Sequence, residues 1–598
     1  MSARALRGRA LAKVAAVGVG LVLIGAAGLR RPIDVNATRV ATGFVLVGAL
    51  ILLLLGIVLW RRHGGSAGQV QRWSRRSRRN DGVASPWALL RVASWIAVRR
   101  RATIVRPSFA QVPRWRRPFV PTTEFATALA RVGALRIWSS AEDVTIRIGG
   151  PRTGKTGELA GRVVEAPGAV IATSTRTDLV YLTGPIRSLC GPVHVFNPSG
   201  LGGLASTITF DPISGCADPR TAVTRASDLL AGVAATGRAG DMEFWQEQAR
   251  RVLAALLHAA AVGGATMRDV LSWVADPDAA SGDVQRALRH SPEPAFELDA
   301  QQFLGTNERT RSSICSTIMP ALGWLSDSTA AEAATGGAFD VDQLLDLRGT
   351  VYMLGADDGQ VAPLVTALTG HIAREARRIA GHKPGGRLDP PLTLALDEAA
   401  LICPIPLDNW TADMGGRGVT IHIAAQSRAQ LRQRWGDVGA AAILNNAATL
   451  MIYGGTRDPD DLAAYSGLTG ERYEDAPTWG RDGDLHSTAA HRVAVLSPAQ
   501  VAQLPAGRAV VIRRGMPPAI GRVQMAWKRR DVRAVVRATT WAKRRCAARA
   551  WAADALDWTA AALAELSPHL SKTASEVRTD NDLRWTGYSP AVAKRWDR

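Results

Sequence analysis

Cysteine is scarce in this sequence, which has only Cys190, Cys216, Cys315, Cys403 and Cys546 among its 598 residues. No two of these cysteines stand at the spacing of zinc ligands, and this excludes a zinc-finger motif. Cysteines so far apart also give no disulfide framework. A reducing compartment is therefore expected for the bulk of the chain.

Acidic residues are few relative to basic ones, 52 against 73, and the formal net charge is +21. A soluble metabolic enzyme has little need for such an excess. The excess fits a polyanionic partner, either nucleic acid or the anionic surface of a membrane. A general preference of the composition for arginine accounts for part of this excess of positive charge.

Charged residues are missing from two stretches near the N-terminus, 14–29 and 40–60. A membrane-spanning helix needs about 20 apolar residues, and snorkelling of Lys13 lengthens the shorter first stretch. We expect a helical hairpin, the alternative being a cleaved signal peptide followed by one anchor. Arginines crowd both outer flanks, so a multi-pass plasma-membrane protein is expected, with both termini and everything after Trp60 in the cytoplasm.

The rest of the chain divides by pattern. Residues 1–62 would form the anchor, and 63–135 a basic linker that either lies against anionic lipid or is a solvated connector. Segment 222–345 lacks strand patterns and predicts an all-α insertion within one α/β domain, made of 136–221 and 346–530. Residues 531–598 predict a basic, partly helical tail. Short apolar runs predict buried strands of a parallel sheet at 144–148, 169–173, 193–196, 350–354, 392–396, 420–424, 449–453 and 509–512.

The sharpest motif is GGPRTGKT at residues 149–156, between a predicted strand and a predicted helix. It matches G-x-x-x-x-G-K-[ST] in full, a turn whose backbone N–H groups surround phosphate oxygens at a helix N-terminus. Lys155 is expected to reach the β- and γ-phosphates of ATP, and Thr156 to bind Mg²⁺. The predicted nucleotide site comprises Gly149, Gly150, Pro151, Arg152, Thr153, Gly154, Lys155, Thr156 and Gly157.

A second motif is the apolar run 392–396 followed by two acids, Asp397 and Glu398. This is a Walker B pattern, in which Asp397 would hold Mg²⁺ directly or through water. Glu398 would polarise the attacking water. A plain exit from a strand into a loop is the alternative interpretation of two such acids. The P-loop elsewhere in the chain favours the catalytic one.

Two further residues are candidates for the same site. Gln426 follows the run 420–424, and a polar side chain at that strand end would sense the γ-phosphate. Arg417, on the Gly-rich segment 415–418, could enter a neighbouring subunit's site and stabilise charge on the transferred phosphoryl group. A strand-end glutamine that bonds a loop and an ordinary exposed arginine are the alternatives.

Several segments together resemble the TraG/TraD group, the coupling proteins of conjugative type IV secretion systems. They are the two apolar stretches, IGGPRTGKT at 148–156, EAPGAVIATSTRTD at 165–178, VFNP at 195–198, FDP at 210–212, FW at 244–245, LDEA at 396–399, AQS at 425–427, GGTRD at 454–458 and YSGLTG at 465–470. The resemblance covers roughly residues 10–530. It is carried by the combination, since the Walker motifs alone are common to many ATPases.

The resemblance implies a RecA-like P-loop NTPase domain with an inserted all-α domain, preceded by two transmembrane helices. It also implies a homo-hexamer that recruits relaxase-bound single-stranded DNA and delivers it to a type IV secretion channel. Lys155, Thr156, Asp397, Glu398 and Gln426 take the roles given above. Arg417 is less secure, because some members carry the finger slightly earlier, where this chain has Gly415 and Gly416.

Two other functions remain open. One is a double-strand DNA translocase of the FtsK/HerA type, which shares the motor fold. The large helical insertion, and the absence of a recognisable C-terminal winged-helix pattern, disfavour it. The other is a membrane scaffold that binds nucleotide and recruits secreted proteins without hydrolysis, and an intact Glu398 disfavours that one.

Overall fold

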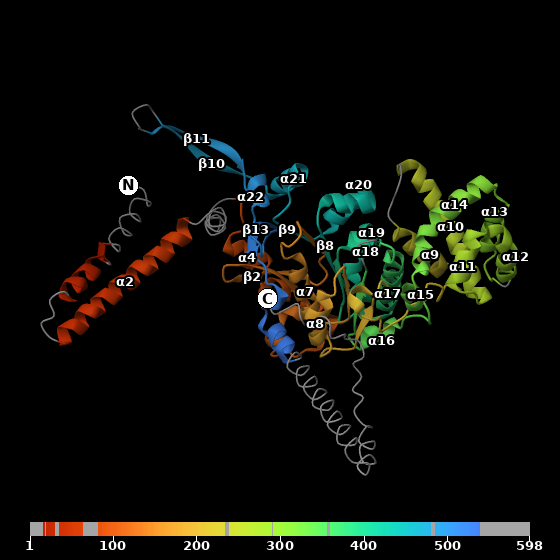
Figure 1. The fold of residues 1–598 in the computed structure, drawn as a ribbon, viewed down its shortest axis with the longest axis horizontal. Coiled ribbons are helices and arrows are strands. Elements are labelled where there is room, and N and C mark those ends of the chain that lie inside the picture. The colour runs from red at the N-terminus through yellow and green to blue at the C-terminus, as the bar shows by residue number, and fades with distance from the viewer. Residues whose placement is uncertain are drawn as a thin grey trace, which may run out of the picture.

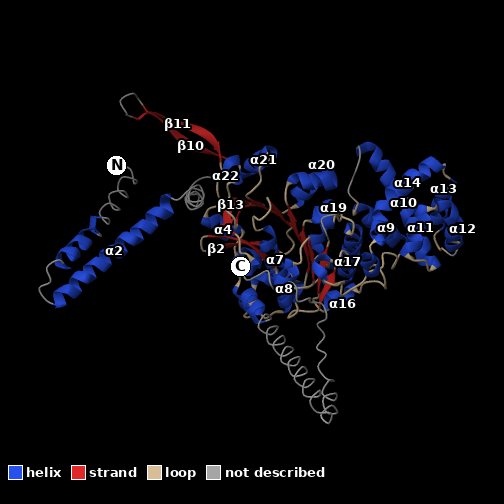
Figure 2. Cartoon of the chain, in the orientation of Figure 1, coloured by secondary structure: helices blue, strands red, loops and turns tan. Residues whose placement is uncertain are grey.

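The computed structural model describes residues 16–17, 19–29, 35–63, 82–233, 239–289, 291–355, 359–479 and 485–538. Within these residues the chain is a mixed α/β structure, with helices around a large central sheet (Figures 1 and 2). The strands are β1 (Ala126–Val132), β2 (Leu135–Ser140), β3 (Thr145–Ile148), β4 (Val170–Ser174), β5 (Val193–Phe196), β6 (Thr350–Leu354), β7 (Leu392–Asp397), β8 (Val419–Ala425), β9 (Thr449–Tyr453), β10 (Glu471–Trp479), β11 (Leu485–Ala494), β12 (Arg508–Arg513) and β13 (Met516–Arg522).

The large sheet has 11 strands in the order β2-β1-β13-β12-β9-β3-β8-β7-β4-β6-β5. The seven strands from β9 to β5 run parallel to one another. The pairing of β9 with β12 is antiparallel, and so is every pairing from β12 to β2. The parallel strands β4, β6, β7 and β8 are buried along their whole length, as expected for strands covered by helices on both faces.

All eight predicted strand runs form strands of this sheet, and the first seven of them make its parallel part. The prediction is wrong for the run 509–512, because it forms β12, which pairs antiparallel with β9 and β13. Strands β1, β2 and β13 were not anticipated. They extend the sheet by antiparallel pairing, and Arg131 in β1 lies opposite Arg522 in β13. β1 lies inside the segment that the sequence suggested was a linker. β10 and β11 form a separate two-stranded hairpin that projects from the body (Figure 1).

The helices begin and end at conventional signals. They are α2 (Val35–His63), α4 (Pro86–Val92), α5 (Trp95–Arg99), α6 (Ala102–Val105), α7 (Lys155–Glu165), α8 (Asp178–Arg187), α9 (Pro219–Ala231), α10 (Ala239–Gly263), α11 (Met267–Ala275), α12 (Pro277–Leu288), α13 (Pro294–Gly305), α14 (Glu308–Leu322), α15 (Ser328–Ala333), α16 (Val341–Asp346), α17 (Ala362–His382), α18 (Ala399–Ile402), α19 (Leu407–Asp413), α20 (Arg428–Asn446), α21 (Pro459–Thr469) and α22 (Pro498–Ala502). Proline stands in the first turn of α4, α9, α12, α13, α17 and α21, and side-chain caps include Asp218, Asp276 and Asn307.

Between β5 and β6 the described chain contains helices and no strand. Helices α10 to α14 gather at one end of the molecule, on the side away from the β10–β11 hairpin (Figure 1). Apolar side chains of these helices, such as Leu253, Val270 and Phe303, are buried. Their cluster is continuous with residues of the sheet such as Ile146 and Ile171.

The N-terminal segment differs from its prediction. No helix, taken over its described residues, is long and apolar enough to cross a membrane. A spanning helix must meet both conditions, because about 20 apolar residues are needed to cross the hydrocarbon core. The prediction of two spanning helices, and with it the multi-pass plasma-membrane location with cytoplasmic termini, is therefore wrong. Residues 14–15 and 18 of the first stretch lie outside the described residues.

Candidate nucleotide site

The turn between β3 and α7 is shaped by its glycines. Gly154, the residue before the first helical turn, has φ +105°, a left-handed conformation that a side chain disfavours. A Cβ atom on Gly150 would lie 2.8 Å from the carbonyl oxygen of Gly455. Thr153 Oγ1 closes the turn by donating to the Gly150 carbonyl at 2.8 Å. The turn therefore opens directly onto the N-terminus of an 11-residue helix, where backbone N–H groups favour anions.

Lys155 is buried at the start of α7, and its ammonium group folds back into this turn. Its Nζ donates to the carbonyl oxygen of Gly149 and, at 3.1 Å, to that of Gly150. Burial lowers the pKa of Lys155, and the carboxylates of Glu398 and Asp397 act in the opposite direction. The Lys155 ammonium is thus held where the phosphate chain of a nucleotide would lie.

Asp397, the last residue of β7, contacts the P-loop through its side chain. Thr156 Oγ1 donates to Asp397 Oδ2 at 2.7 Å, across 241 positions of sequence. The other carboxylate oxygen, Oδ1, is buried and has no hydrogen-bond partner among the described residues. Burial raises the pKa of Asp397 to about 6. A buried carboxylate oxygen left without a donor is costly unless a cation or solvent completes it.

Glu398 and Gln426 form a second contact next to the first. Glu398 adopts a left-handed conformation, φ +50°, immediately after β7. Gln426 Nε2 donates to Glu398 Oε1 at 3.2 Å, and Glu398 Oε2 has no hydrogen-bond partner within the described chain. Because β8 lies between β3 and β7 in the sheet, the residue after β8 lies between the P-loop and the acids. The sheet order explains why Gln426 reaches this site.

Arg417 lies elsewhere in the chain. It precedes β8, whereas Gln426 follows it, so the seven-residue strand separates them by roughly 23 Å at about 3.3 Å per residue. Its Nε pairs with Asp413 Oδ2 at 3.1 Å, and Arg377 also pairs with Asp413, at 3.0 Å. The structure thus brings together Lys155, Thr156, Asp397, Glu398 and Gln426, but it leaves Arg417 outside this group within one chain.

The arrangement fits Mg²⁺ bound jointly with a nucleotide. A threonine hydroxyl in contact with a carboxylate is a hard oxygen pair of the kind that Mg²⁺ uses together with phosphate oxygens and water. The described part of the chain has no group of three or more His, Cys, Asp and Glu side chains that could hold a metal ion. Thr156 and Asp397, with the unpaired Oδ1, are the residues that would hold Mg²⁺.

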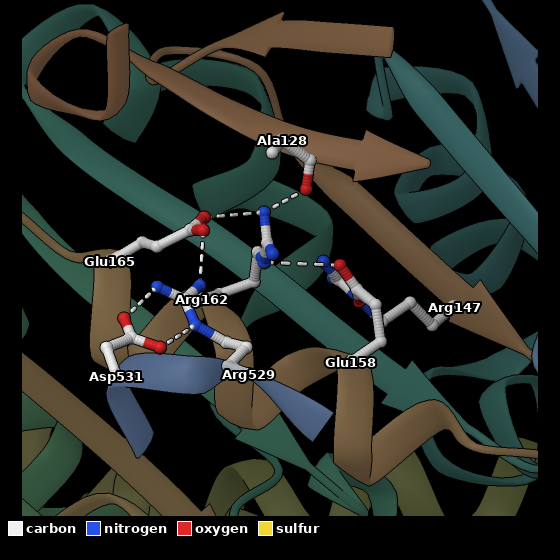
Figure 3. A network of polar contacts seen from close by, with 7 residues as sticks. All are labelled: Ala128, Arg147, Glu158, Arg162, Glu165, Arg529 and Asp531. Carbon is white, nitrogen blue, oxygen red and sulfur yellow. Dashed lines mark hydrogen bonds and ion pairs between the residues drawn. The ribbon is translucent and has the colours of Figure 1, made fainter. Parts of the chain in front are cut away.

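Sequence reasoning missed a buried ionic network behind the P-loop (Figure 3). Arg147, in the middle of β3, pairs with Glu158 on α7, and both side chains are completely buried. Arg162 also pairs with Glu158, at 3.2 Å, and with Glu165 at 3.0 Å. An arginine inside a four-residue buried strand was the available signal, since such a charge demands a partner. The network fixes α7, and with it the turn at residues 149–156, against β3.

Sequence reasoning also missed two residues from the far end of the chain. A Cβ atom on Gly154 would collide with the Met525 side chain, and one on Gly157 with the indole ring of Trp527. Nothing in the local sequence around residue 525 signals a nucleotide site. Only the antiparallel strands that follow β9 carry this segment back to the P-loop.

Comparison with known proteins agrees with these observations. Residues 391–506 match the family model described as the TraM recognition site of TraD and TraG. No curated protein matches the chain. The bacterial conjugative coupling protein TrwBdeltaN70, in its unbound monoclinic form, has a TM-score of 0.52 at 18% identity, covering 67% of this chain and 90% of that one.

Two other structures of the plasmid coupling protein TrwB are also similar. One is a complex with the non-hydrolysable GTP analogue GDPNP, with TM-score 0.50, 18% identity and coverage of 65% and 88%. The other is a complex with ADP and Mg²⁺, with TM-score 0.50, 19% identity and coverage of 64% and 86%. At such identities the likeness establishes a shared fold. With the family match over residues 391–506, it confirms the resemblance to the TraG/TraD-like coupling proteins that the motifs predict.

Proposed function

We propose that this chain is an ATP-hydrolysing coupling protein that recruits relaxase-bound single-stranded DNA and passes it to a type IV secretion channel. The observation that carries the proposal is the 2.7 Å contact between Thr156 and Asp397, which joins the P-loop to the end of β7. The family match and the net charge of +21 support a DNA substrate. TrwB, a protein of the same fold, is found with ADP and Mg²⁺, which supports nucleotide binding here.

Each residue of the site has a role in this proposal. Backbone N–H groups of residues 150–157 and the Lys155 ammonium bind the phosphates, and Gly154 keeps the turn open. Glu398 orients the attacking water and takes its proton, as the bond between the γ-phosphorus and the bridging oxygen breaks and ADP leaves. Gln426 holds Glu398 in position through the 3.2 Å hydrogen bond. Mg²⁺, when bound by Thr156 and Asp397, neutralises charge on the phosphates.

The proposal also covers the helical segment, the assembly and the partners. The helices between β5 and β6 would form the all-α insertion domain predicted at residues 222–345, facing the DNA. In a homo-hexamer Arg417 would act in the site of a neighbouring subunit and not in its own, since within one chain it lies at the opposite end of β8 from Gln426. Residues 391–506, which match a model named for TraM recognition, would contact the DNA-processing complex.

This function is tested by whether single-stranded or duplex DNA stimulates ATP hydrolysis more strongly. We expect single-stranded DNA to stimulate hydrolysis by the purified chain more strongly than duplex DNA of equal length, and Lys155→Ala to abolish both rates. The measurement is phosphate release at fixed ionic strength, because binding to DNA depends steeply on salt. A preference for duplex DNA would point to a double-strand translocase. ATP binding without any hydrolysis would point to a scaffold, and either result would contradict the proposal.

A further inference from the structure

The segment that follows β13 lies directly on the P-loop. Met525 packs on Gly154 and Trp527 on Gly157, two positions where no side chain would fit beside them. Backbone hydrogen bonds link the same regions through Gly507, which accepts from Val523 N at 2.9 Å and donates to the Thr153 carbonyl at 3.5 Å. Trp527 lies in a short 3₁₀ helix, η8 (Ala526–Lys528), that contacts α7. An aromatic ring from residue 527 thus lies at the first residue after the phosphate-binding motif.

This segment is held firmly on α7. Ala526 is completely buried in a cluster with Leu159 and Val163, which both lie on α7, the helix that follows the P-loop. Arg529 pairs with Glu165 near the end of α7, and its Nη2 pairs with Asp531 at 2.6 Å (Figure 3). Yet Trp527, between these two anchors, stays 47% exposed. The indole is therefore fixed in place while much of its surface is open to solvent.

We propose that Trp527 is the platform on which the base of the bound nucleotide stacks, with Met525 filling the space between the ring and Gly154. This inference rests on the proposed nucleotide site. The phosphates occupy the turn that ends at Thr156, so the nucleoside must lie outside that turn, and the indole at Gly157 borders it. A flat, pre-positioned aromatic surface is what a purine base needs for stacking.

The platform also predicts which ligands gain affinity from the ring. Stacking tolerates any base because every base has a π-face, so Trp527 contributes to ATP and GTP alike. It contributes nothing to a ligand that has phosphates but no base. Arg529 is a positioning residue in this arrangement, because it touches Glu165 and Asp531 and acts on the nucleotide only through Trp527.

Equilibrium binding tests the platform without any turnover. We expect Trp527→Ala to raise the Kd for ATP and for GTP by about tenfold, the size of one base–aromatic contact. The Kd for inorganic tripolyphosphate should stay within about twofold of the wild-type value, and Trp527→Phe should retain most of the ATP affinity. Trp87→Ala, which removes an equally large ring on α4 that is 74% exposed, is the matched control and should change neither Kd.

The possible outcomes separate this proposal from the site itself. If Trp527→Ala loses affinity for ATP and for tripolyphosphate equally, the ring only supports the fold. If its affinity for ATP is unchanged, the base lies elsewhere. Either result overturns the platform. Lys155→Ala tests the site independently, because it should weaken both ligands. If it weakens neither, the proposed nucleotide site fails, whatever Trp527 does.

Discussion

Replacing Glu398 with glutamine is expected to lower the rate of ATP hydrolysis by about 10²- to 10⁴-fold, the usual contribution of a general base. Glutamine keeps the size of the side chain and can still contact Gln426, so the local packing is retained. It cannot accept the proton of the attacking water. ATP affinity should remain within a few-fold of wild type, because in the proposed site the phosphates are held by Lys155 and the turn and not by Glu398.

This result is measured as single-turnover hydrolysis together with ATP binding. Glu308→Gln is a suitable control, because Glu308 is an exposed glutamate in the first turn of α14, far along the chain from the site. It should leave both quantities unchanged. Normal turnover in Glu398→Gln would show that another group activates the water, and the role assigned to Glu398 would be lost.

Replacing Glu158 with glutamine is expected to lower the free energy of unfolding by about 3–5 kcal/mol, the cost of leaving a buried charge unpaired. Glu158 is the carboxylate that pairs with Arg147, and both side chains are 0% exposed. Arg162 would keep Glu165 as its partner. The loss therefore falls on Arg147, in the strand that leads into the P-loop.

A double variant sharpens this prediction. Adding Arg147→Met to Glu158→Gln removes the uncompensated charge and should recover a large part of the lost stability, measured by urea unfolding. Glu247→Gln is the matched surface control, since the pair of Glu247 with Arg250 is exposed and should contribute under about 1 kcal/mol. If the double variant is no more stable than Glu158→Gln alone, the buried pair does not explain the loss.

The parallel core could be predicted from sequence because its strands are short, continuous apolar runs. β7 and β8 are examples, and the acids and the glutamine at their ends marked the site. β1, by contrast, is rich in alanine and interrupted by Arg131, which gives a weak strand signal. It is a strand because β2 and β13 pair with it, and pairing between distant segments is not visible in local composition.

The candidate site, like the sheet, could be predicted only where a local sequence pattern marks it. Lys155, Thr156, Asp397 and Glu398 belong to motifs whose spacing is itself the signal. Trp527 lies 370 positions after Gly157, and no local pattern relates the two residues. Its contact depends on the chain order of β9, β12 and β13, which carries η8 back over α7. The parts of the site that come from tertiary topology are those that sequence reasoning missed.

The most direct test of the whole account is the equilibrium affinity of the chain for ATP in the presence of Mg²⁺, with and without the Lys155 side chain. Lys155→Ala removes the charged donor held in the P-loop, and we expect the Kd to rise at least about tenfold. Lys383→Ala, at an exposed lysine after α17, should bind as wild type does. If Lys155→Ala binds ATP as tightly as this control, the nucleotide does not lie in the turn at residues 149–156, and the account is contradicted.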